Sequence, residues 1–201
     1  MISVGVGAAF ARPVHRAPVA VAETDPTPVP TRSAPSEASR SDVRSPAPPA
    51  AVPQVPARPR PVAGLSQPQM DNAAVIVGVG RSLGLPVRAH LVALSTALQE
   101  SGLRVLANPT VPESLRYPHQ GVEADYDSVG LFQQRATQGW GPVALLMDPV
   151  GSTRLFYQRL VQVPGWQLLT VTAAAQAVQR SAFPDAYAGQ QARAQQVLDA
   201  L

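Results

Sequence analysis

Proline and aromatic residues are divided unevenly along this chain of 201 residues, and the division limits where a folded core can form. Residues 1–70 contain 14 of the 22 prolines and a single aromatic residue, Phe10. Residues 71–201 contain both tryptophans, all four tyrosines and the other three phenylalanines. A segment poor in large apolar side chains cannot bury enough surface to offset its loss of conformational entropy. Only the second part of the chain can therefore form a core.

The first part divides into two segments. Residues 1–11 form a short apolar run that ends in small residues, which is typical of a truncated export signal, although the usual positive start is missing. The alternative is a disordered start of the chain. Residues 12–65 are rich in Pro, Ala, Ser and Thr, which favours a disordered, extended spacer over a helix. The spacer either holds the domain away from a membrane, lets it thread a porous wall, or has no selected role. We expect residues 66–201 to form the folded domain.

The net charge of +3 lies in the spacer and not in the expected domain. Residues 1–70 hold 7 arginines and 4 acidic residues, whereas residues 71–201 hold 9 of each. Phosphate binding depends on clustered positive charge, so a neutral domain argues against nucleic-acid binding. The chain has no lysine, which is typical of proteins from GC-rich genomes.

Metal, cofactor and membrane-spanning classes are also disfavoured. The chain has no cysteine, and its three histidines are not at ligand spacing, so we expect no metal site and no cofactor. No run approaches the ~20 apolar residues that span a bilayer, so we expect no integral membrane span. We expect the protein to be a monomer.

Helix-starting and helix-stopping residues alternate through residues 66–201. They predict helices from Pro68 to about Gly84, from Pro86 to Gly102, from Asp148 to Gly165 with Val163 inside, from Thr170 or Thr172 to Val178, and from Pro184 onward. Strand-like alternation is not sustained anywhere, so the domain is predicted to be mainly α. The long polar stretch 103–129 predicts a functional loop or a small hairpin.

Glu100 is the candidate for chemistry because it falls in the last turn of its predicted helix. The helix dipole disfavours negative charge there by roughly 0.3–1 kcal/mol. Burial against Ala93 and Ala97 would add to this effect and raise the pKa of the carboxyl group. A raised pKa suits a general acid that protonates a glycosidic oxygen. The alternative is a solvated glutamate at a frayed helix end.

Two sequence blocks resemble a known enzyme group. ALQESGL, residues 97–103, and SVGLFQQ, residues 128–134, are similar to the two signature blocks of soluble lytic transglycosylases and goose-type lysozymes. In that group a helix ends in Glu-Ser and is followed later by Gly-Leu-Met-Gln. Phe132 stands where the methionine is usual, which keeps the apolar contact. The resemblance covers roughly residues 68–190, and it implies a lysozyme-like helical domain.

The resemblance also implies roles for individual residues. Glu100 would be the catalytic acid, Ser101 would orient it or the substrate, and Gln133, with Gln134 as a weaker addition, would hydrogen-bond the glycan. The alternative for both glutamines is exposed helix polarity. SAFPDAYAG, residues 181–189, partly matches a third block and makes Tyr187 a groove residue, although Ala188 stands where asparagine is usual.

The two tryptophans offer flat faces on which sugars stack, but an indole that fills the core is the commoner use. We expect Trp166 in the core and leave Trp140 open between the two roles.

A second carboxylate would decide the type of reaction. Glycoside hydrolysis generally needs two carboxyl groups about 5–9.5 Å apart, whereas intramolecular transfer can proceed with one. Asp125 and Asp127 are the candidates, although both also fit a solvated turn. One well-placed acid favours non-hydrolytic cleavage, which leaves an anhydro-sugar.

The leading hypothesis is therefore a secreted or cell-envelope-associated enzyme that cuts peptidoglycan glycan strands, by lytic transglycosylase or muramidase chemistry. The main alternative is a non-catalytic module that binds cell-wall glycan and does not depend on Glu100. A third possibility is a structural helical domain without affinity for glycans.

Overall fold

Residues 58–180 and 187–201 are described by the computed structural model of this chain. The expected export signal at residues 1–11 lies outside the described residues, as does the spacer up to residue 57. Pro184, at which we expected the last helix to begin, also lies outside them.

The described residues are mainly helical, as the sequence predicts. Their α-helices are α1 (Gln67–Ser82), α2 (Val87–Ser101), α3 (Val143–Met147), α4 (Pro149–Gln162), α5 (Val171–Gln179) and α6 (Gln191–Asp199). Three short 3-10 helices are η1 (Ser114–Arg116), η2 (Ala136–Gln138) and η3 (Ala188–Gln190). Four strands of two residues each are β1 (Leu106–Ala107), β2 (Gly121–Val122), β3 (Ser128–Val129) and β4 (Gln134–Arg135). None of the described helices combines the length and the apolar character that crossing a bilayer requires.

Helix ends coincide with capping residues that the sequence identifies. The side chains of Asp148 and Thr170 accept hydrogen bonds from the first turns of α4 and α5. Gly102 ends α2 with a left-handed backbone, which lets its N–H bond the last carbonyls of that helix. Capping therefore fixes where α2 ends, and with it the position of the residues in its last turn.

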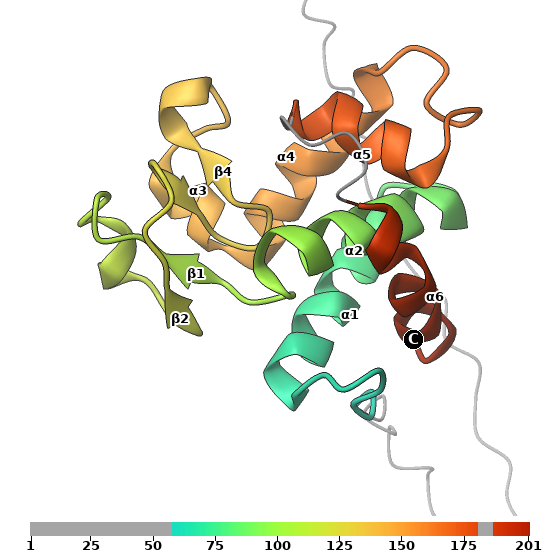
Figure 1. The fold of residues 1–201 in the computed structure, drawn as a ribbon, viewed down its shortest axis with the longest axis horizontal. Coiled ribbons are helices and arrows are strands. Elements are labelled where there is room, and N and C mark those ends of the chain that lie inside the picture. The colour runs from blue at the N-terminus through green and yellow to red at the C-terminus, as the bar shows by residue number, and fades with distance from the viewer. Residues whose placement is uncertain (1–57, 181–186) are drawn as a thin grey trace, which may run out of the picture. The chain divides into compact units, whose positions relative to one another are not determined.

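Helix α2 lies at the centre of the described helices (Figure 1), and ten of its fifteen residues are buried. It packs against α1, α4, α5 and α6. Trp166 is only 3% exposed and belongs to the same core, as expected. Because α2 is packed against helices on several sides, the backbone at its C-terminal end is held in a fixed position.

Residues 103–135 lie to one side of α2 and contain the strands (Figure 1). β1 and β2 pair in parallel, and β3 and β4 form an antiparallel hairpin in which Ser128 lies opposite Arg135. A bridge between Leu106 and Gly130 connects the two pairs. Two-residue strands are too short for a period-two pattern, which explains why sequence periodicity does not reveal them.

The structure differs from the sequence expectations at three places. The packed region begins before Ser66, since Leu65 is buried and Arg58 forms an ion pair with Asp71. Helix α4 ends at Gln162, so Val163 follows the helix and does not belong to it. The last described helix is α6, which is shorter than the helix expected from Pro184 onward.

Gly130 is the position where the hairpin allows no side chain. Its φ of +77° lies in the left-handed region, and a Cβ atom there would lie 2.0 Å from the carbonyl oxygen of Leu146. Gly139 has a similar φ of +71° but open space around it. The two glycines therefore separate the cost of backbone strain from the cost of a clash.

We predict that Gly139→Ala lowers the free energy of unfolding by about 1–2 kcal/mol, the cost of a left-handed non-glycine residue. Gly130→Ala adds the clash with Leu146 and lowers it by roughly 2–5 kcal/mol. Urea denaturation of the two variants measures the difference. Equal losses would contradict the close approach of Gly130 to Leu146.

Candidate functional site

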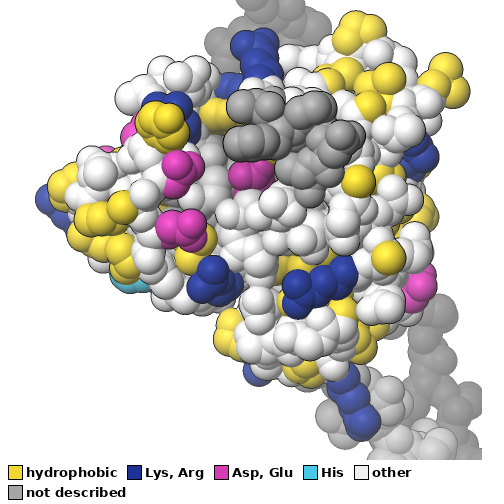
Figure 2. Space-filling view, in the orientation of Figure 1, with side chains coloured by type: hydrophobic (Ala, Val, Ile, Leu, Met, Phe, Trp, Pro, Cys, Tyr) yellow, Lys and Arg dark blue, Asp and Glu magenta, His cyan; other side chains and the backbone are white. Residues whose placement is uncertain are grey.

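A groove of about 560 Å³ lies beside the C-terminal end of α2. Four of the residues predicted from the sequence line it, namely Glu100, Asp125, Gln133 and Trp140. The groove also contains basic residues that the sequence did not single out. Figure 2 shows acidic and basic side chains close together on one face of the molecule.

Glu100 is half-buried at the end of α2. The Tyr187 hydroxyl group donates a hydrogen bond of 2.6 Å to Glu100 Oε1. Burial raises the pKa of Glu100 above its usual value, hydrogen bonds from Tyr187 and Gln179 act in the opposite direction, and the charge of Asp125 raises it further. The net effect is a raised pKa of the carboxyl group beside the groove.

Ser101 holds the end of α2 against the hairpin and does not line the groove. Its side chain is 4% exposed, and its hydroxyl group donates to the carbonyl oxygen of Leu131 at 2.7 Å. Ser101 can therefore orient Glu100 only indirectly, by fixing the backbone at the end of α2. A direct contact with a substrate is not available to so buried a hydroxyl group.

Gln133 lies in the turn of the hairpin and has a φ of 45°, which is unusual for a residue with a long side chain. Its Nε2 donates to the carbonyl oxygen of Gly130 at 3.0 Å while the side chain lines the groove. Strained backbone of this kind often occurs at functional sites. The preceding Phe132 is buried and stacks on Phe156 with ring centroids 4.6 Å apart, which anchors the turn.

Three predicted site residues, Ser101, Gln134 and Tyr187, are buried and do not line the groove. Gln134 is 1% exposed, and its Nε2 donates to the carbonyl oxygen of Ser152 in the interior. Gln133 lies in the turn before β4, whereas Gln134 begins β4 with its side chain in the interior, so only Gln133 reaches the groove. Gln134 is therefore corrected from a groove residue to a buried contact between β4 and α4.

Asp127 is also corrected, because its carboxylate is engaged elsewhere. It forms an ion pair with Arg135 and accepts a hydrogen bond of 2.6 Å from the Thr137 hydroxyl group. Burial acts to raise the pKa of Asp127, but the hydrogen bonds from Thr137 and Arg135 outweigh it and hold the pKa below its usual value. Asp125 is exposed and lines the groove, so it is the remaining candidate for a second carboxylate.

Trp140 presents little ring surface to the groove. The indole is 7% exposed, and the guanidinium group of Arg159 lies over its ring, 3.5 Å from the centroid. Arg159 also donates to the carbonyl oxygen of Gly139 at 2.7 Å. A sugar therefore cannot stack on the face that Arg159 covers, and Trp140 acts as a support for the arginine.

Sequence reasoning missed Gln179, Arg159 and Arg180, which come from α4 and α5 and line the groove. Gln179 donates to the carbonyl oxygen of Phe132 at 2.7 Å, so it ties the end of α5 to the hairpin turn. Nothing in the local pattern distinguishes these residues from ordinary polar residues on a helix. Only the packing of α4 and α5 against α2 brings them to Glu100.

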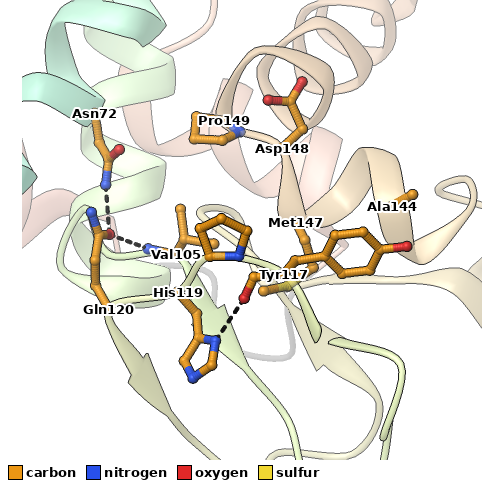
Figure 3. A pocket seen from close by; sticks show the side chains of 10 residues that line it. Asn72, Val105, Tyr117, His119, Gln120, Ala144, Met147, Asp148 and Pro149 are labelled. Carbon is orange, nitrogen blue, oxygen red and sulfur yellow. Dashed lines mark hydrogen bonds between the residues drawn. The ribbon is translucent and has the colours of Figure 1, made fainter. Parts of the chain in front are cut away.

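A second cavity, of about 290 Å³, lies between α1, α4 and residues 117–120 (Figure 3). Its lining is mostly apolar, and its polar side chains already have hydrogen-bond partners. Asn72 donates to Gln120, which also accepts from the backbone N–H of Val105, and His119 bonds to a backbone carbonyl (Figure 3). Because these groups already have partners, this cavity offers less for chemistry than the Glu100 groove.

No protein-family model matches this sequence, and no curated protein does. Within residues 58–180 and 187–201, no three His, Cys, Asp or Glu side chains gather as metal ligands. The feature that distinguishes the site is the half-buried carboxyl group of Glu100 beside an open polar groove.

We predict that Tyr187→Phe raises the pKa of Glu100, because it removes a hydrogen bond that stabilises the charged carboxylate. An NMR titration of the glutamate side-chain carboxyl carbons measures this shift. Tyr117→Phe is the matched control, since the Tyr117 hydroxyl group donates to Glu113 on the surface. An unchanged or lowered pKa of Glu100 in Tyr187→Phe would contradict the role assigned to the tyrosine.

Proposed function

We propose that this protein cleaves the glycan strands of peptidoglycan with Glu100 as general acid, on a lysozyme-like fold. The observation that carries the proposal is the half-buried Glu100 carboxyl group, whose pKa is raised beside a groove of about 560 Å³. A general acid must keep its proton near neutral pH until the substrate is bound. Burial of Glu100 promotes this state.

The resemblance of ALQESGL and SVGLFQQ to lytic transglycosylases and goose-type lysozymes supplies the substrate class. It is supported by the placement of Glu100 and Gln133, one from each block, in the same groove. Amide side chains such as Gln133 and Gln179 are suited to bond the hydroxyl and acetamido groups of a glycan. Because peptidoglycan lies outside the membrane, the proposal also requires a secreted or envelope-associated protein.

In the proposed reaction, Glu100 donates its proton to the glycosidic oxygen while the bond from that oxygen to the anomeric carbon breaks. Positive charge develops on the sugar ring, and either water or a hydroxyl group of the same sugar adds to the anomeric carbon. The carboxylate of Glu100 can then take the proton that the attacking oxygen releases. The acid is restored at the end of the cycle.

We favour attack by the sugar's own hydroxyl group, which gives an anhydro-sugar. Asp127 is held by Arg135, and Asp125 is exposed, so Glu100 is the one half-buried carboxyl group among the described residues of the groove. A hydrolase generally needs a second, well-placed carboxylate to activate water or to stabilise the sugar cation. The intramolecular route needs only one.

We predict that Glu100→Gln lowers the rate of peptidoglycan cleavage at least about a hundredfold, because the amide keeps the shape of the side chain but has no acidic proton. Release of soluble fragments from purified cell walls measures the rate. Glu113→Gln removes an exposed carboxylate outside the groove and serves as the control. Unchanged cleavage by Glu100→Gln would end the enzymatic proposal. Wall binding without cleavage by the unaltered protein would favour the non-catalytic module.

The folding stability of Glu100→Gln gives an independent check. A carboxyl group whose folded-state pKa is raised contributes stability at low pH, and this contribution is lost as pH rises through the folded-state pKa. We therefore predict that Glu100→Gln unfolds at a higher temperature than the unaltered protein at pH 7, with a smaller difference at pH 4. A lower unfolding temperature at pH 7 would contradict the burial of the charge.

The reaction type is tested by Asp125→Asn and by mass spectrometry of the products. We predict products lighter by one water than those of a muramidase, and only a small change of rate in Asp125→Asn. Hydrolysed products that disappear in Asp125→Asn would instead assign muramidase chemistry, with Asp125 as the second carboxylate.

A further inference from the structure

Arg159 and Arg180 stand where the Glu100 groove meets a second hollow. Both line the groove, and both also line a neighbouring hollow of about 420 Å³. The apolar part of that hollow comes from Val163 and Pro164, which follow α4, and from Ala177 and Val178 of α5. A ligand that extends beyond the Glu100 groove on this side must therefore pass both arginines.

Neither arginine is neutralised by a carboxylate of the described residues. The ion pairs there are those of Arg58 with Asp71 and of Arg135 with Asp127. Arg159 is held against Trp140, and Arg180 is exposed at the end of α5. Burial lowers the pKa of Arg159, and the charge of Arg180 lowers it further. The charge that acts on Arg159 is thus that of another cation, Arg180.

Among the described residues, neither carboxyl group of the groove forms an ion pair with Arg159 or Arg180. Glu100 accepts a hydrogen bond from Tyr187 instead, and burial raises its pKa. The carboxylate of Asp125 accepts from the Ser128 hydroxyl group at 3.3 Å, and its charge acts on Glu100. Two like charges held together in a groove cost free energy, which a bound anion offsets.

We propose that Arg159 and Arg180 form an anion subsite that binds a carboxylate carried by the glycan, with a small alkyl group beside that carboxylate seated in the apolar hollow. The inference rests on the proposed function for its glycan. Guanidinium groups bind carboxylates through paired hydrogen bonds of matching geometry. Arg159 is fixed by its contacts with Trp140 and Gly139, whereas Arg180 is exposed and can turn toward the ligand.

The carboxylate has two possible sources, the ether substituent of an acidic sugar or a peptide attached to that substituent. Three tetrasaccharide probes distinguish them. The first is the neutral N-acetylglucosamine tetramer. The second alternates N-acetylglucosamine with N-acetylmuramic acid and keeps the lactyl carboxylate free. The third carries a short peptide on the lactyl group, so that only the peptide offers a carboxylate.

The test measures binding of these probes by calorimetry to the full chain with Glu100→Gln, which prevents turnover. We expect at least one acidic probe to bind about tenfold tighter than the neutral tetramer, the effect of roughly one charge-assisted hydrogen bond. Adding Arg180→Gln should remove this advantage by weakening the acidic probe more than the neutral one, and Arg180→Lys should keep part of it. Arg154→Gln is the matched control, because Arg154 is an exposed arginine of α4 outside both hollows.

The outcomes separate this subsite from the proposed function. Equal affinity for neutral and acidic probes, or an advantage that survives Arg180→Gln, would overturn the anion subsite and leave the role of Glu100 intact. Failure of every probe to bind would contradict the proposed function and the subsite together. An advantage lost equally in Arg154→Gln would show a general effect of net charge and would also overturn the subsite.

Discussion

The buried contact between the end of α2 and the hairpin turn is the constraint on which the site depends. The Ser101 hydroxyl group donates to the carbonyl oxygen of Leu131 at 2.7 Å. Ser101 directly follows Glu100, and Leu131 lies two residues before Gln133. Gln179 makes the equivalent bond to the carbonyl oxygen of Phe132 from α5. These two bonds fix three separate chain segments around one carboxyl group. Because unmet buried carbonyl groups are costly, the arrangement resists relaxation.

The same arrangement makes the charged form of Glu100 costly, and this cost is what suits the side chain to donate a proton. A carboxyl group at the negative end of a helix, partly removed from water, is less stable in its charged form than in solution. The fold can hold it there because α2 is buried against α1, α4, α5 and α6, which supplies stability far from the acid. Tyr187 limits the shift by donating to Glu100 Oε1. The acid is thus poised by opposing interactions, which suits the proton transfer that we propose.

The success of sequence reasoning varied with the range of the interaction involved. Asp148 and Gly102 marked helix ends correctly, and Thr170 is the cap of the two threonines considered, because capping acts within a few residues. Gln134 and Asp127 were misplaced because their directions depend on distant partners. The strand pairing of β4 turns Gln134 inward, and Arg135 takes the carboxylate of Asp127. Arg159 and Arg180 escaped notice because no local pattern marks an arginine that will share a groove.

The sequence by itself determined the division between a proline-rich first part and a helical domain, the ends of α2, and the location of a glutamate where a helix disfavours its charge. These follow from composition and from contacts between near neighbours. Only the tertiary structure decided that Glu100 meets Tyr187, that Gln133 and not Gln134 reaches the groove, and that two arginines stand together at its edge. Such contacts join residues as far apart as α2 and Tyr187, and packing alone selects them.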